Sequence, residues 1–126
     1  MSTPEDRSYT RDHEWIRIAD GVATVGITAY AAEQLGDIVY ADLPAAGDAV
    51  TVGRLMGEIE STKSVGEINA PLDGEVLESN QEVLDGPELV NEDPFERGWL
   101  VKIKPASDPV GLLTAAEYEA LLAAEA

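Results

Sequence analysis

The sequence predicts a mainly β protein, a flattened barrel or sandwich with a short helix near residues 28–35 and a C-terminal helix. Three observations favour this class. Short apolar runs separated by Gly, Asp, Asn and Pro fill the chain from about residue 9 to residue 103. Near residue 114 the apolar period changes to that of a helix. A length of 126 residues with 44% hydrophobic content suits one domain, residues 1–126, whose residues 1–8 we expect to be loose.

The first two predicted strands form a hairpin. Apolar and other side chains alternate over residues 15–18, and Asp20–Gly21 is a typical tight turn into a return strand at residues 22–27. The short helix follows at once. Thr28 is suited to cap its start and Gly36 to end it.

The rest of the sheet region is predicted from shorter signals. A loop is expected from Asn80 to Gly98, because this stretch contains Pro87 and Pro94. A helix is expected over residues 114–125, which open on the capping-box pattern Thr-Ala-Ala-Glu. Further strands are predicted over residues 38–43, 55–60, 65–68, 75–78 and 99–104.

A weak internal echo supports paired sheets. Residues 36–39 and 74–77 both read as Gly, an acidic residue and two apolar residues, and a second glycine follows each after a similar interval, at Gly47 and Gly86. The hairpin around Lys63 falls between the two halves. Such a plan predicts a pseudo-symmetric flattened barrel or sandwich.

Composition excludes several functions. A formal net charge of −17, from 25 acidic and 8 basic residues, argues against binding to nucleic acid or to an anionic membrane. The charge suits either simple solubility or partners with basic docking surfaces. The lack of cysteine and the single histidine, His13, argue against metal clusters and against a Ser–His–Asp triad. We expect a soluble, cytoplasmic monomer, because no apolar leader or membrane span is evident.

Lys63 is the most informative residue. Of the three lysines, Lys102 and Lys104 alternate with apolar residues, as on the solvated face of a strand. Lys63 instead lies among small hydroxylated residues, with a predicted strand on each side. A lysine in a turn is usually only solvated. This one is displayed at the tip of a hairpin without bulky neighbours, which suits a covalently attached prosthetic group.

The segment ESTKSVGEINAPLDGEV, residues 60–76, closely resembles the lipoylation hairpin of the glycine cleavage H-protein family. The resemblance implies a hammerhead-like lipoyl-domain fold and a carrier without catalysis of its own. It also implies lipoate joined to Lys63 by an amide bond. Further motifs that match the family in order are YTRDHEWI at residues 9–16, GIT at 26–28, QLGDIV at 34–39, LP at 43–44, LVNEDPF at 89–95 and GW at 98–99.

The resemblance also implies partners. These are a pyridoxal-phosphate glycine decarboxylase, a tetrahydrofolate-dependent aminomethyltransferase, dihydrolipoyl dehydrogenase and a lipoyl-attaching enzyme. A tethered arm that visits several active sites works at high effective concentration, so its hairpin has to be rigid. We expect Gly57 and Gly66 to let the strands pack closely beside the tip. Ala29 and Gln34 depart from the residues usual in the family and leave the details of the cleft open.

The resemblance further implies that the lipoyl arm on Lys63 carries the aminomethyl group of glycine from the decarboxylase to the aminomethyltransferase. This group is cationic, and its adduct is labile in water, so a carrier has to shelter it. By resemblance Glu14 is the candidate cleft residue, with Asp12 and Glu67 as further candidates. The alternative for Glu14 is an ordinary carboxylate on the surface of a strand. Glu58 and Glu60, near the tip, suit recognition by the lipoyl-attaching enzyme or simply a solvated face.

Other functions are compatible with parts of the sequence. A protein of the same fold that relays lipoyl groups to other enzymes would share every motif. A biotin carrier is disfavoured because Thr62 and Ser64 replace the methionines usual beside its lysine. A Schiff-base enzyme is disfavoured because its lysine needs a desolvated pocket, which a polar hairpin tip does not provide. An interaction module without modification stays open.

Overall fold

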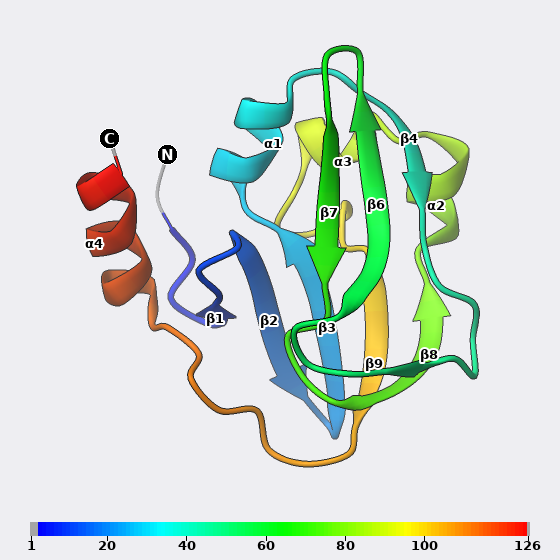
Figure 1. The fold of residues 1–126 in the computed structure, drawn as a ribbon, viewed down its shortest axis with the longest axis vertical. Coiled ribbons are helices and arrows are strands. Elements are labelled where there is room, and N and C mark those ends of the chain that lie inside the picture. Colours follow the sequence, from blue (N-terminus) through cyan, green and yellow to red (C-terminus); the bar gives the residue numbers. More distant parts are fainter. Residues whose placement is uncertain (1–2, 126) are drawn as a thin grey trace.

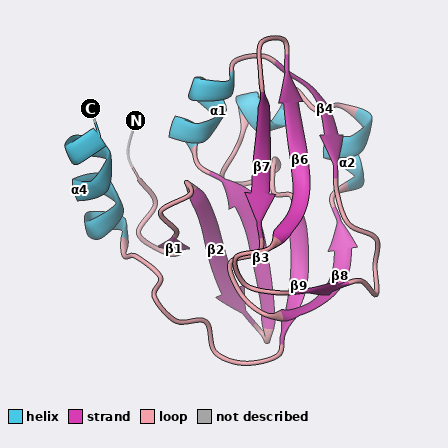
Figure 2. Cartoon of the chain, viewed as in Figure 1, coloured by secondary structure: helices cyan, strands magenta, loops and turns pink. Residues whose placement is uncertain are grey.

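The computed structural model describes residues 3–125 and confirms a mainly β fold (Figures 1 and 2). Two antiparallel sheets form an open sandwich. The larger sheet has the order β1 (Ser8–Tyr9), β2 (Glu14–Ala19), β3 (Val22–Ile27), β9 (Val101–Pro105), β8 (Gly74–Ser79) and β5 (Ala49–Val50). The smaller sheet has the order β4 (Ile38–Asp42), β6 (Leu55–Ser61) and β7 (Val65–Asn69). The helices are α1 (Ala29–Leu35), α2 (Gln81–Asp85), α3 (Leu89–Glu92) and α4 (Ala115–Glu125).

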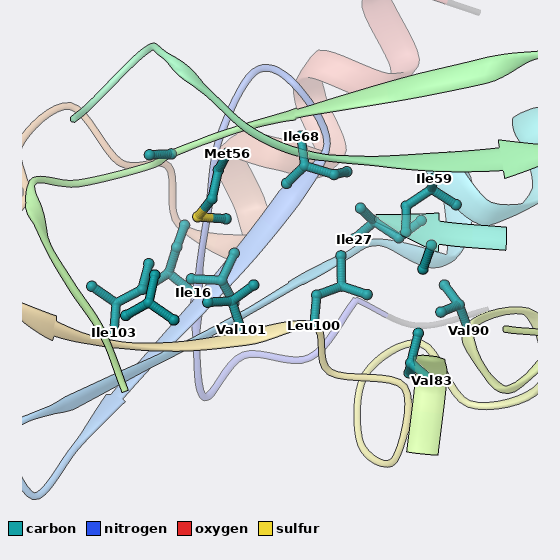
Figure 3. Packing of buried hydrophobic residues seen from close by; sticks show 14 of the residues in the cluster. Ile16, Ile27, Met56, Ile59, Ile68, Val83, Val90, Leu100, Val101 and Ile103 are labelled. Carbon is teal, nitrogen blue, oxygen red and sulfur yellow. The ribbon is translucent and has the colours of Figure 1, made fainter. Parts of the chain in front are cut away.

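The main apolar core lies between the two sheets (Figure 3). Ile59 and Ile68 contribute to it from the smaller sheet, and Val25 and Ile103 from the larger; all four are almost completely buried. Apart from Gly26, which is also buried, their neighbours along each strand are more exposed, as the period-two pattern of a strand predicts. The hairpin of β6 and β7 extends beyond this core at the top of Figure 1.

The predicted first hairpin and the short helix that follows it are confirmed. The β2–β3 hairpin turns at Asp20 and Gly21, whose φ angles of 53° and 76° are those that the tightest hairpin turns require. The Thr28 side chain caps α1 by accepting a hydrogen bond from the backbone N–H of Ala31. Gly36 ends the helix with a φ of 86°.

The loop predicted from residue 80 to residue 98 is wrong, because α2 and α3 lie within it. The side chain of Asn80 accepts a hydrogen bond from Glu82 N, so it caps α2, and Gly86 ends that helix. Val83 of α2 and Val90 of α3 are fully buried. The prolines in this stretch fall between and after the helices, where proline is tolerated, and so do not exclude them.

The start of the chain is more ordered than expected. Within the described residues, the expectation of a loose segment is wrong at Arg7, whose guanidinium donates to Phe95 O at 2.6 Å and lies 4.7 Å from the ring centre of Trp15. Ser8 already belongs to β1. A buried arginine needs such partners, and the aromatic rings and the carboxylates of Asp6 and Glu96 supply them. Residues 1 and 2 lie outside the described residues.

The predicted C-terminal helix is confirmed as α4. Thr114 N donates to the Glu117 carboxylate and Glu117 N donates to the Thr114 hydroxyl, which is the reciprocal arrangement of a capping box. Tyr118 packs on Tyr9, with ring centres 4.8 Å apart, in a second small cluster. No helix within residues 3–125 has the length and apolar character needed to cross a membrane.

Candidate carrier site

The tip of the β6–β7 hairpin is a tight, hydrogen-bonded turn that displays Lys63 to solvent. Ser61 N donates to Ser64 O at 2.8 Å. The Ser61 hydroxyl accepts from Lys63 N and from Ser64 N, at 3.3 and 3.0 Å, and donates to Ser64 O at 3.1 Å. Serine side chains that bond the backbone two or three residues on stabilise turns in this way. The backbone that carries Lys63 is therefore held in one conformation while its amine stays exposed.

The C-terminal end of α1 supports this tip. Lys63 passes over Gly36: a Cβ added to Gly36 would lie only 3.2 Å from Lys63 Cε and 3.8 Å from Nζ. On the next strand a Cβ at Gly66 would lie 3.1 Å from a methyl group of Leu35. Thr62 N also donates to Asp37 O at 3.1 Å. The helix end and the tip are thus in direct contact.

Close packing beside the tip requires glycine. A Cβ at Gly57 would lie 2.6 Å from the carbonyl oxygen of Asp42, so the close approach of β4 and β6 depends on the missing side chain. The expectation for Gly57 is confirmed. At Gly66 the close neighbour is Leu35 of α1 rather than another strand.

Glu14 lies at the other end of the hairpin and is buried, with 2% of its surface exposed. Its Oε2 accepts from Asn69 N at 2.9 Å, and its Oε1 accepts from the Thr10 hydroxyl at 3.3 Å. Burial, with the charge of Asp12 as a smaller cause in the same direction, raises the pKa of Glu14 to about 8, although the two hydrogen bonds oppose the shift. The interpretation of Glu14 as an ordinary surface carboxylate is wrong.

The three candidate carboxylates of the cleft do not form a single cluster. Asp12 is exposed but close to Glu14, because the N–H groups of both residues donate to the Thr10 hydroxyl. Glu67 is exposed on the outer face of the smaller sheet, directly opposite Glu58. Within residues 3–125 no hydrogen bond or ion pair joins Lys63 to any of the three carboxylates. In the same part of the chain no cluster of metal-ligating side chains occurs.

Comparison with known proteins identifies the family. A model of the glycine cleavage H-protein matches residues 7–125. The chain is 53% identical to the glycine cleavage system H protein of Thermobifida fusca over 125 residues, which are 99% of both chains. It is 55% identical to that of Streptomyces avermitilis over 119 residues, 94% of this chain and 95% of the relative. The chain belongs to the glycine cleavage H-protein family.

A solved structure agrees with this assignment. The crystal structure of a glycine cleavage system H protein from Mycobacterium marinum is 44% identical, superposes with a TM-score of 0.91, and covers 95% of this chain and 98% of its own. Members of the H-protein family are carrier components of the glycine cleavage system and not catalytic enzymes. The chain is therefore a carrier component that works with the enzymes of that system.

Several residues that shape the site are not identified from the sequence. Ser61 has a recognisable signal, a serine two and three residues before the groups that it bonds. Gly36 is predicted as a helix stop, but its position beneath Lys63 is not. Asn69 and Asn91 have no local signal, because the bonds they make join segments more than fifty residues apart.

Proposed function

We propose that Lys63 carries lipoate through an amide bond between its Nζ and the lipoate carboxyl group. The observation that carries the proposal is the exposed Lys63 side chain on a hydrogen-bonded turn; within residues 3–125 this side chain makes no hydrogen bond or ion pair. A thin arm needs such an open anchor, since bulky neighbours would hinder its attachment. When bound, lipoate supplies a disulfide at the end of a long arm, which accepts the aminomethyl group of glycine.

The chain's own residues provide the rest of the carrier. The hydrogen-bonded turn and the contacts with α1 keep the base of the arm fixed, so that movement is confined to the arm. We further propose that Glu14 helps to shelter the loaded amine. A buried carboxyl with a raised pKa gains most from a cation beside it, because the cation favours its ionised form. Asp12, which is exposed nearby, would add to the same negative potential. Glu67 lies on the outer face and is the weakest of the three.

The proposed partners are the decarboxylase, the aminomethyltransferase, dihydrolipoyl dehydrogenase and the lipoyl-attaching enzyme. The outer face of the smaller sheet supports docking of basic surfaces, because Asp42, Glu58 and Glu67 lie in one row across its three strands. Like charges placed directly opposite one another are destabilising, so a basic partner would relieve repulsion there. Action in the cytoplasm, as a monomer, is part of the same proposal.

Intact mass of the protein purified from its native source tests the attachment. We expect an increment equal to lipoate, which disappears in Lys63→Arg and stays in Lys104→Arg, a matched change of an exposed lysine on β9. A native pool without the increment would leave only an interaction module. A lipoyl-transfer assay with separate acceptor domains decides between aminomethyl carriage and lipoyl relay, because a relay protein would pass its lipoyl group on.

The lifetime of the loaded carrier tests Glu14. Glu14→Ala and the closer isostere Glu14→Gln are expected to shorten this lifetime while attachment of lipoate continues. Asp108→Asn removes one negative charge at an exposed position away from the hairpin and serves as the control. If both Glu14 variants hold the loaded group as long as the unchanged protein does, Glu14 has no part in sheltering it.

A further inference from the structure

The side chain of Asn91, in α3, replaces a strand partner for the segment that follows α1. Its Nδ2 donates to Gly36 O at 2.8 Å, and its Oδ1 accepts from Ile38 N at 2.9 Å. One amide group therefore satisfies a backbone acceptor and a backbone donor two residues apart. Such a bidentate contact fixes both the position and the orientation of residues 36–38.

Residues 36–38 are the part of the chain on which the hairpin tip rests. Asp37 O accepts from Thr62 N at 3.1 Å, immediately before Lys63. Gly36 lies beneath the lysine methylenes, with φ 86° and ψ −154°, a conformation that is essentially restricted to glycine. Glycine adopts this region without strain, so its own backbone does not fix residues 36–38, and contacts from outside have to select their conformation. The Asn91 amide is one of the groups that hold it.

We propose that Asn91 is a positioning residue for the lysine that carries the prosthetic group. The contact runs from α3 through the Asn91 amide to residues 36–38, and from there to Thr62 and the stem of Lys63. The role rests on the proposed function of Lys63. The proposal gives a role to Asn91 of the LVNEDPF motif, a residue that the carrier function does not otherwise involve.

Asn80 offers a matched control. Its side-chain amide also bridges backbone groups, because Nδ2 donates to Arg97 O and Trp99 O while Oδ1 accepts from Glu82 N. None of these bonds reaches the hairpin or residues 36–38. Asn80→Ala therefore reports what the loss of a buried bridging amide does to the whole fold, and Asn91→Ala adds any effect that is specific to the tip.

The first measurement is hydrogen exchange of the Thr62 amide in the unmodified protein, followed by nuclear magnetic resonance. We expect Asn91→Ala to speed this exchange about tenfold, the factor that follows from loss of one net hydrogen bond. We expect Asn80→Ala to leave it within about twofold of the unchanged protein. Should Asn91→Ala fold poorly, Asn91→Asp keeps the shape of the side chain and the acceptor for Ile38 N, but loses the donor to Gly36 O.

The second measurement is the rate at which a purified lipoyl-attaching enzyme modifies each variant. We expect kcat/KM to fall about tenfold in Asn91→Ala, because the amine is no longer presented in one geometry, and to stay unchanged in Asn80→Ala. Equal effects of the two variants on exchange and on attachment would overturn the positioning role. If the unchanged protein is not modified at all, the proposed function of Lys63 fails, and the Thr62 exchange still decides whether Asn91 holds the tip.

Discussion

The buried carboxyl of Glu14 makes the stability of this protein depend on pH in an unusual direction. Most paired carboxylates lose stabilising interactions as the pH falls. Glu14 is the opposite case, because burial raises its pKa to about 8. The folded protein then keeps a proton that the unfolded chain releases, throughout the range between the ordinary pKa of 4.5 and about 8. A rise in pH through this range therefore favours the unfolded chain.

The magnitude follows from the same two values. The contribution of Glu14 to the free energy of unfolding is fully present below pH 4.5 and is lost as the pH rises through about 8. The total loss in the free energy of unfolding between pH 4.5 and about pH 8 is about 5 kcal/mol, a large part of the stability of a domain of this size. Glu14→Gln keeps the oxygen that can accept from Asn69 N but has no proton to lose. The free energy of unfolding of this variant is therefore expected to lack the fall with rising pH that Glu14 causes.

The assay is urea unfolding of both proteins at intervals from pH 4.5 to pH 9. The quantity of interest is the free energy of unfolding of the unchanged protein minus that of Glu14→Gln, because the other acidic groups cancel in this difference. We expect the difference to fall with rising pH. Asp108→Asn, at an exposed position, controls for the loss of one negative charge from a protein of net charge −17. A flat difference would show that the Asn69 and Thr10 hydrogen bonds balance burial, and a difference that rises with pH would show that they outweigh it; either result refutes the raised pKa.

Two further changes test the packing by urea unfolding. Gly57→Ala is expected to cost about 1–3 kcal/mol, because its Cβ would meet Asp42 O. Gly66→Ala is expected to cost less, because the neighbour of its Cβ is the flexible Leu35 side chain. Equal costs would contradict the dependence of the β4–β6 approach on Gly57. Tyr118→Phe is expected to cost about 1–2 kcal/mol, since its hydroxyl bonds both the His13 ring at 2.8 Å and the Thr28 hydroxyl at 2.7 Å. An unchanged stability would mean that these two bonds do not hold α4.

Much of the fold follows from local signals. The β2–β3 hairpin, α1 and α4 each begin and end at residues whose own chemistry favours those positions, such as Asp20–Gly21, Thr28 and Thr114. The helices α2 and α3 are missed because their prolines receive more weight than the cap at Asn80 and the glycine at Gly86. The two-residue strands β1 and β5 carry too few residues for any periodic pattern.

The site is predictable only in part. The sequence places Lys63 in a turn because strand-like residues lie on both sides of it. Burial of Glu14 is not predictable from its neighbours, since it begins a strand and its acceptor role depends on Asn69, 55 residues away. The support from Asn91 is missed for the same reason. Contacts between distant segments depend on how the sheets stack, which short-range patterns do not encode.

Under the function proposed for Lys63 and Glu14, the geometry of β7 lets one hairpin both display an arm and shelter its load. Lys63 and Asn69 are six residues apart, so about 20 Å of strand separates the anchor at the tip from the Glu14 carboxyl at the base. Each end is held from outside the hairpin, the tip by Asp37 and the base by Glu14. A strand fixed at both ends moves little, so an arm that folds back along it meets the carboxyl at a defined place.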